Sequence, residues 1–357
     1  MARKKTTIYD IASSLNVSVA TVYRALHNTG RISAVTKQRI LDKAEEMHFK
    51  INQSAQGIRR DPVTIGILLC CPVASFLEEI QSGIEYEFNN LSDYNYYADI
   101  HTLPSVNTEE CPEAVSEIFM KFKERKYGGV IAFLSGSSES VAPALKELET
   151  ADIPMTCLVN DLCYKNRVAF IGADGYCAGR IAAELLSLSC RNQRIAILTG
   201  DSSIHIHKEN LSGFIAEAGK DLFSCTDIYE HKDLPALVTQ KLDEILTHEP
   251  RYQGLYITSA SSITACSYLA THPMDCSMRI ITTDLYYPIK EQLKKGTLCA
   301  TIFQNPFLQG RKAVSSLYAY LQRQPVKDVV KIAPQIVMRS NIDMYYVRQP
   351  EDEKTQE

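Results

Sequence analysis

The sequence of 357 residues has no long apolar run. Its most apolar window, Ile65 to Phe76, is interrupted by Gly66 and Pro72 and is shorter than the roughly 20 residues that a membrane-spanning helix needs. The N-terminus, MARKKTTIYD, is basic but has no apolar stretch behind it, so it does not have the pattern of a signal peptide. We therefore expect a cytoplasmic protein without a membrane partner.

The common motifs of enzymes are also missing. Neither G-x-G-x-x-G nor G-x-x-x-x-G-K-[ST] occurs, so no phosphate-binding loop is predicted. The serine-rich run from Leu134 to Ser138 does not satisfy G-x-S-x-G, the turn that presents a nucleophilic serine. We expect no enzymatic activity, no cofactor and no metal ion.

The eleven cysteines do not form a recognisable metal or disulfide framework. They are scattered and odd in number, and none lies in a C-x-x-C pair. Cys70 and Cys71 are adjacent in an apolar segment that reads as a buried strand. We interpret the cysteines as small buried hydrophobic residues that stay reduced in the cytosol.

Charge divides the chain into two parts. Residues 1–60 hold eleven Lys or Arg and four Asp or Glu, a net charge of +7. The other 297 residues hold 27 basic and 38 acidic side chains, a net charge of −11. A basic end on an acidic body is typical of a protein that touches a polyanion with one end only.

The basic end has the pattern of a helix-turn-helix. Thr7 and Asp10 form a capping pair before a first amphipathic helix, Ser18 can cap a second, and Ser33 a third that runs to Met47. The turn at Asn16-Val17 is too short to be a separate loop, so the first two helices must pack together. The expected buried positions are Ile8, Ile11, Ala12, Leu15, Val22, Ala25, Leu26, Val35, Ile40, Leu41, Ala44 and Met47.

From Val63 onward, short apolar runs alternate with amphipathic segments. The predicted strands are 64–71, 129–133, 155–159, 169–171, 194–199, 254–258, 279–283 and 300–304. The predicted helices are 76–91, 111–125, 141–151, 177–190, 234–248, 262–272 and 305–323. This alternation favours parallel sheets with helices on both faces, and roughly 290 residues of it predict two lobes.

Three segments at fixed spacing carry a family resemblance. Thr7 to Leu26 match T-I-x-D-I-A-x-x-L-x-V-S-x-x-T-V-x-R-A-L, Arg39 to Leu41 read R-I-L, and a hinge follows as Asn52-x-x-Ala55-x-x-Ile58. These residues resemble the lactose-repressor/galactose-repressor (LacI/GalR) family of bacterial transcription regulators. The body resembles the periplasmic sugar-binding-protein fold, with landmarks at Ile65-Gly66-Ile67, Gly83-Ile84-Glu85, Ile171-Gly172-Ala173-Asp174, Leu198-Thr199-Gly200 and the run from Gly296 to Gly310.

The resemblance implies an organisation and a fold class. Residues 1–50 would be the helix-turn-helix DNA-binding headpiece, 51–62 the hinge, 63–347 an effector-binding and dimerisation domain, and 348–357 a polar tail. The fold class is then α/β: a helical headpiece and hinge, followed by a two-lobed periplasmic-binding-protein-like domain with parallel sheets. The implied partners are double-stranded, pseudo-palindromic operator DNA, a second copy in a homodimer, and a small-molecule effector, a sugar or polyol.

In a helix-turn-helix the start of the second helix enters the major groove. Arg24 can donate two hydrogen bonds to a guanine or clamp a phosphate. Tyr23 replaces a serine that is usual in the family, and it can contact phosphate, contact a base or pack. Ile58 takes the position of a leucine that wedges the minor groove, or else docks on the body. The implied DNA-binding residues are Thr7, Ser18, Val19, Ala20, Thr21, Tyr23, Arg24, His27, Ser33, Thr36, Asn52, Ala55 and Ile58.

The resemblance also assigns residues to a cleft between the lobes. Amides and carboxylates suit the hydroxyls of a polyol, and an aromatic ring suits its C–H face. Where many members have an arginine, this chain has Asn210, which argues against an anionic effector at that position. His205 and His207 can contact the effector or, with Glu209 on one side of an extended segment, a metal ion. The implied effector residues are Phe76, Ser135, Asn160, Asp161, His205, His207, Asn210, Ser259, Asp284 and Gln304.

The resulting prediction is a transcriptional repressor whose operator affinity depends on an effector. A receptor whose headpiece contacts protein is the alternative from another class, and the basic headpiece argues against it. An enzyme of sugar metabolism is a third alternative, for which no catalytic motif exists. The effector's identity, its action as inducer or corepressor, and the operator sequence stay open.

Overall fold

The computed structural model describes residues 8–15, 17–27, 32–47, 62–91, 95–104, 111–135, 141–202, 204–232, 234–259, 261–272 and 278–345. The chain forms two compact units, one made of residues 1–61 with 93–95 and the other of 62–92 with 96–357. We describe each unit by itself. The hinge residues Asn52, Ala55 and Ile58, as well as Thr7 and the tail 348–357, lie outside the described residues.

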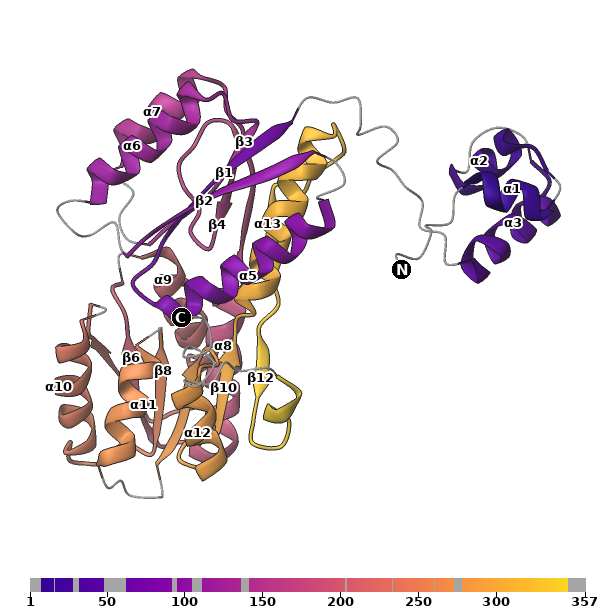
Figure 1. Cartoon of the computed structure of the whole chain (residues 1–357). Coiled ribbons are helices and arrows are strands. Elements are labelled where there is room, and N and C mark those ends of the chain that lie inside the picture. Colours follow the sequence, from indigo (N-terminus) through magenta and orange to yellow (C-terminus); the bar gives the residue numbers. More distant parts are fainter. Residues whose placement is uncertain are drawn as a thin grey trace. The chain divides into compact units, whose positions relative to one another are not determined.

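The first unit contains three helices, α1 (Ile8–Leu15), α2 (Val19–His27) and α3 (Ala34–Glu46) (Figure 1). The Ser18 and Ser33 hydroxyls accept hydrogen bonds from the backbone N–H groups of Thr21 and Thr36, both at 3.1 Å, which confirms these two predicted caps. The small core consists of Ile11, Ala12, Val22, Ala25, Ile40 and Ala44.

Val35 is 73% exposed, so its predicted place in the buried stripe is wrong. It lies five residues before Ile40, which is about 140° around the helix, whereas Ala44 is only about 40° away.

The N-terminal lobe of the second unit is built on a sheet of six strands in the order β11-β5-β4-β3-β1-β2, with every pairing parallel. Helices α6 and α7 cover one face of the sheet, and α5 and α13 lie side by side on the other (Figure 1). The elements are β1 (Val63–Cys70), α5 (Ala74–Leu91), β2 (Tyr96–Leu103), α6 (Cys111–Glu124), β3 (Gly129–Leu134), α7 (Ala142–Thr150), β4 (Met155–Leu158), β5 (Arg167–Ala173), α13 (Pro306–Leu321) and β11 (Val329–Ile332).

The C-terminal lobe repeats this plan with the order β12-β10-β9-β8-β6-β7, in which only β12 runs antiparallel to its neighbour. Its elements are α8 (Gly175–Cys190), β6 (Arg194–Thr199), α9 (His205–Ala218), β7 (Cys225–Glu230), α10 (Pro235–Leu246), β8 (Gly254–Thr258), α11 (Ser262–Thr271), β9 (Arg279–Thr283), α12 (Tyr287–Lys295), β10 (Ala300–Phe303) and β12 (Gln335–Val337). A short 3-10 helix, Ile342–Met344, follows.

The chain passes between the lobes three times, from β5 to α8, from β10 to α13 and from β11 to β12. Two of these crossovers lie side by side, because the Asp174 N–H donates to the Ile332 carbonyl at 3.0 Å. Beside them Lys331 of β11 donates to both carboxylate oxygens of Glu209 on α9, each at 2.8 Å. The lobes are therefore joined by backbone and by an ion pair at the same place.

Several elements differ from the sequence prediction. The edge strands β2 and β7, the short strands β11 and β12, and helices α9 and α12 were not predicted. The segment from His205 to Glu209 is the first turn and a half of α9, so the expectation of an extended segment is wrong. In a helix, residues two apart point in directions about 200° apart, and His205, His207 and Glu209 cannot share one side.

Candidate functional site

The predicted effector residues follow strands of the two sheets. Ser135 comes after β3, Asn160 after β4, Ser259 after β8, Asp284 after β9 and Gln304 after β10. In parallel α/β sheets, ligands bind outside the carboxyl ends of the strands. The two carboxyl edges come within electrostatic range of each other: burial and, to a smaller extent, the negative charge of Asp284 raise the pKa of the thiol of Cys71, which directly follows β1. We call this region the interlobe junction.

Asp284 is the best-defined residue of the interlobe junction. It is 2% exposed and has a left-handed backbone with φ of 70°. Its N–H donates to the Ile302 carbonyl at 2.9 Å, its own carbonyl accepts from the Thr301 hydroxyl, and its carboxylate accepts from the Gln304 side-chain amide at 2.8 Å. Burial raises the pKa of Asp284 to about 7, although Gln304 and His207 act in the opposite direction.

Tyr286, two residues after Asp284, lies within electrostatic range of this carboxylate and was not predicted. The side chain is 6% exposed, and its hydroxyl is buried without a hydrogen-bond partner among the described residues. Burial, followed by the charges of Asp284, Cys71 and Glu79, raises its pKa well above the usual value. The proximity of Tyr286 to Cys71 and Glu79 could not be predicted from the sequence, since those two residues belong to the other lobe.

Phe76 and Asn160 form the N-terminal side. Phe76, in the first turn of α5, is 7% exposed and packs edge-on against Phe133 with the ring centroids 6.0 Å apart. The Asn160 amide N–H donates to the Leu134 carbonyl at 2.8 Å, and its buried carbonyl oxygen has no partner within the described ranges. Ser135 is half-buried, and its N–H donates to the Cys70 carbonyl at 2.9 Å.

On the C-terminal side, Ser259 has an unusual backbone, with φ of 142°, and its N–H donates to the Thr283 hydroxyl at 2.9 Å. Its hydroxyl lies 3.3 Å from Nε2 of His231, a fully buried residue at the end of β7. His231 was missed because β7, a half-exposed edge strand, was missed.

Two predicted effector residues are engaged elsewhere. The Asp161 carboxylate is exposed and accepts two hydrogen bonds from one nitrogen of Arg167, at 2.7 and 2.8 Å. Asn210 is 4% exposed, donates to the Ile206 carbonyl at 3.1 Å and accepts from the Tyr256 hydroxyl at 2.8 Å. Both polar ends of Asn210 are therefore satisfied inside the C-terminal lobe.

The two predicted histidines lie differently. His205 has a side chain that is 58% exposed, and its Nε2 lies 3.4 Å from Glu209. His207 is half-buried and close enough to Asp284 for its charge to lower the pKa of that carboxyl. Of the pair, only His207 is within electrostatic range of the interlobe junction.

In the headpiece, Arg24 is exposed on α2, while Val19 packs partly against the core. The Thr21 hydroxyl lies 2.8 Å from that of Ser18, and the Thr36 hydroxyl 2.7 Å from that of Ser33. Ala20, Tyr23 and His27 belong to α2, and their side chains lie outside the described part.

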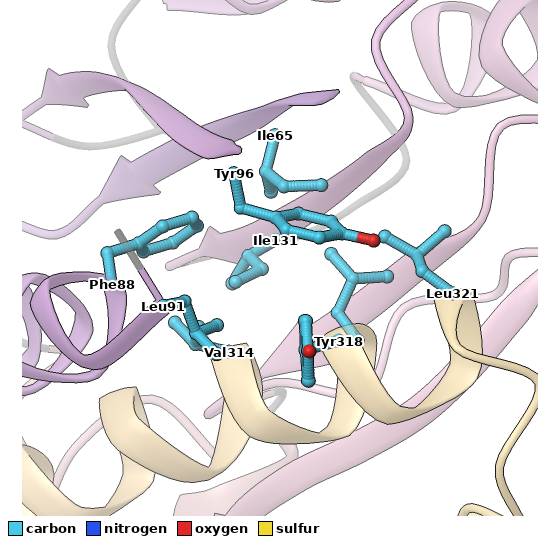
Figure 2. A pocket seen from close by; sticks show the side chains of 9 residues that line it. Ile65, Phe88, Leu91, Tyr96, Ile131, Val314, Tyr318 and Leu321 are labelled. Carbon is cyan, nitrogen blue, oxygen red and sulfur yellow. The ribbon is translucent and has the colours of Figure 1, made fainter. Parts of the chain in front are cut away.

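The described part of the chain also bears on metal binding, on membrane-spanning helices, on the cysteines and on cavities. No group of three or more His, Cys, Asp or Glu is arranged to hold a metal ion, and no helix is long and apolar enough to cross a membrane. The described cysteines are free thiols; Cys163 is exposed, so the prediction of burial is wrong for that residue. Figure 2 shows an apolar cavity between the sheet of the N-terminal lobe and α5 and α13; at about 10 Å³ it has room for about one water molecule, not a sugar.

Together, a helix-turn-helix headpiece and a two-lobed α/β body with polar groups at the lobe junction define a class: DNA-binding proteins that carry a ligand-binding domain. Comparisons with known proteins agree. Residues 7–52 match the family model for bacterial regulatory proteins of the lacI family, and residues 75–325 match the periplasmic binding protein domain. The chain belongs to the lacI family of bacterial regulatory proteins, with a periplasmic binding protein domain as its body.

The relatives and structural neighbours are distant. The ribose operon repressor of Bacillus subtilis is 23% identical over 90% of this chain and 94% of its own length. The HTH-type transcriptional regulator DegA of the same organism is 28% identical over 60% of this chain and 62% of its own length. GanP, a glucose-galactose binding protein from Geobacillus stearothermophilus, has the same fold as the body, with a TM-score of 0.68 and 21% identity over 79% of this chain and 99% of its own.

Proposed function

We propose that this regulator is a repressor that binds operator DNA and changes its operator affinity when a small polyol-like effector binds at the interlobe junction. The observation that carries the proposal is the pairing of Asp284 with Gln304, at 2.8 Å, where the carboxyl edges of both sheets approach each other. A ligand held there would touch both lobes, so its binding energy could change the angle between them.

The DNA-binding part of the proposal concerns a homodimer. One headpiece reads only a few base pairs, while two headpieces related by a two-fold axis read half-sites about one helical turn apart. The exposed Arg24 would read a guanine or a phosphate in each half-site, and the two hinge segments with Ile58 would meet at the centre of a pseudo-palindrome.

The effector contacts would come from both lobes. Phe76 would supply the apolar face, Asn160 and Ser135 amide and hydroxyl groups, and Ser259 with Asp284 and Gln304 the groups of the other lobe. The ribose operon repressor among the relatives and the sugar-binding structural neighbours support a polyol as the effector class.

The test begins with purified full-length protein. Selection from random DNA should yield a palindromic sequence, and fluorescence anisotropy with this duplex then measures operator affinity with and without a panel of sugars and polyols. A rise in affinity identifies a corepressor and a fall identifies an inducer. Sedimentation of a monomer that binds one half-site as tightly as the palindrome contradicts the homodimer, and no effect of any ligand on operator affinity contradicts the regulatory role.

A further inference from the structure

The interlobe junction holds a buried acid, Asp284, that has no Lys or Arg partner among the described residues. The carboxylate of Asp284 is 2% exposed, and its hydrogen bond comes from the neutral amide of Gln304. No Lys or Arg in the described ranges lies within 4 Å of it. Burying an unpaired carboxylate is costly, so this site favours either a proton or a cation on Asp284.

The surrounding groups add to this preference. The Tyr286 hydroxyl is more than nine-tenths buried, has no hydrogen-bond partner among the residues that the structure describes, and lies within electrostatic range of Asp284, Cys71 and Glu79. The Tyr286 hydroxyl is thus within electrostatic range of a thiol and two carboxyl groups, which come from both lobes. The group most complementary to such a set is one that offers several N–H donors and a positive charge.

The basic side chains that contact a predicted effector residue or lie at a crossover are committed to other partners. One nitrogen of Arg167 holds Asp161 and the other donates to Asp328 at 2.8 Å. Lys331 pairs with Glu209, and the position that is an arginine in many family members is Asn210, whose polar atoms are satisfied in the lobe. Among the described residues, His207 is the one imidazole whose charge lowers the pKa of Asp284.

We propose that the effector carries a protonated amine, as in an amino sugar or amino polyol, and that Asp284 and the Tyr286 hydroxyl receive this ammonium group. The proposal rests on the proposed function, since it names the chemical class of ligand for the same site. The Asp284 carboxylate accepts hydrogen bonds from two of the ammonium hydrogens. The Tyr286 hydroxyl oxygen accepts a hydrogen bond from the third. The remaining hydroxyls of the ligand face Gln304 and Asn160.

The test uses matched ligands on the full-length protein near neutral pH. Calorimetry compares 1-amino-1-deoxyglucitol with glucitol, and the 2-amino-2-deoxyhexoses with their parent hexoses and N-acetyl derivatives. We expect an amine to bind at least about tenfold more tightly than its neutral partners, in line with a charge-assisted hydrogen bond. Equal or tighter binding of the neutral partners overturns the inference, as does the absence of binding by every amine at millimolar concentration.

Variants locate the charge. Asp284→Asn keeps the shape and can still accept the Gln304 hydrogen bond, so it should abolish the preference for the amine over its neutral partner, whatever the change in absolute affinity. Asp343→Asn removes the same charge from a side chain that is 81% exposed, and the preference should persist. A preference that survives Asp284→Asn overturns the assignment.

The outcomes separate this inference from the proposed function. A neutral polyol that binds and changes operator affinity leaves the regulatory role intact and overturns the amine. An amine that binds through Asp284 and leaves operator affinity unchanged supports the ligand class and contradicts the regulatory role.

Discussion

At the scale of single residues, the ligand role that we propose for Asp284 comes with a cost in the stability of the folded state. Its pKa rises from an ordinary 3.8 to about 7 because burial disfavours the carboxylate. Between these two pH values the folded protein holds a proton that the unfolded chain has lost. Stability of the body should therefore fall as pH rises from about 4 to about 7 and level off above it, and the total change is at most about 4 kcal/mol.

The first prediction follows from this loss of stability with rising pH. Asp284→Asn mimics the protonated acid at every pH, so its free energy of unfolding should exceed that of the wild type increasingly as pH rises to 7.5. Urea unfolding at several pH values from 4.5 to 8 measures the difference, with Asp343→Asn as the control for the loss of one charge. Parallel pH profiles for Asp284→Asn and the wild type would show that Asp284 titrates normally.

The second prediction concerns Arg24, which is exposed on α2. If it reads a guanine, Arg24→Ala should lose about 1–3 kcal/mol on the operator and relax preference at one base pair of each half-site. Anisotropy with single-base operator variants measures this preference. Lys43→Gln on α3, where the lysine pairs with Glu46 at 2.7 Å, is the control. A uniform loss of affinity for all sequences identifies Arg24 as a phosphate contact instead.

At the scale of elements, glycines allow the helices of the pairs α5–α13 and α8–α9 to approach each other closely. An added Cβ at Gly83 would lie 2.0 Å from the Phe307 carbonyl oxygen, and one at Gly310 would lie 2.3 Å from that of Ile80. The second helix pair repeats this at Gly179 and Gly213, where the distances to backbone oxygens are 1.9 and 2.0 Å. Each lobe thus needs two helices at close approach beside its sheet.

The third prediction tests this contact. Gly83→Ala should lower the free energy of unfolding by about 1–3 kcal/mol or more, because the new methyl group meets rigid backbone and the helices must separate. Gly219→Ala is the matched control: its backbone φ is −62°, the nearest atom to its added Cβ is 3.3 Å away, and stability should change by less than about 1 kcal/mol. Thermal unfolding of both variants checks the difference. Equal stability would mean that α5 and α13 can move apart without cost.

The position of each element in the fold explains which elements could be predicted from the sequence. Strands β6, β8 and β9 were predicted with their observed bounds because they are apolar on both faces, as buried parallel strands are. Strands β2 and β7 lie at sheet edges, and their sequences YYADIHTL and CTDIYE mix exposed polar residues with buried ones. Helix α9 begins with the polar run HIHKEN and contains Gly213, so it lacked a helical signal.

The residues of the candidate site could likewise be predicted only in part from the sequence. Phe76, Asn160, Asp284 and Gln304 could be assigned because they stand in matched segments of a known family. Cys71, Tyr286 and His231 could not, because their positions depend on how crossovers and an edge strand bring distant segments together. The resemblance predicted Asp161 and Asn210 as effector residues, yet Arg167 and Tyr256 engage them in the structure.

At the scale of the whole molecule, regulation requires that the interlobe junction and the headpiece influence one equilibrium. Two of the three crossovers and the Lys331–Glu209 ion pair connect the lobes near one another, so we expect a ligand that draws the lobes together to rotate them about this region. Residues 51–62 lead directly into β1 of the N-terminal lobe. In a homodimer, rotation of the two N-terminal lobes changes the spacing of the two hinge segments, whose pairing on DNA we propose to be marginal.

The last prediction is reciprocity. If the effector changes operator affinity by a given factor, saturating operator DNA must change effector affinity by the same factor. A coupling of about 1–3 kcal/mol corresponds to roughly 5- to 150-fold, which calorimetry on the full-length protein can resolve with and without the operator duplex. The ligand is the member of the amine and polyol series that binds most tightly. Asp284→Ala should abolish the effector response and leave effector-free operator affinity unchanged, because Asp284 lies in the second compact unit and not in the headpiece. Effector affinity that is identical with and without operator would show that the two sites are independent.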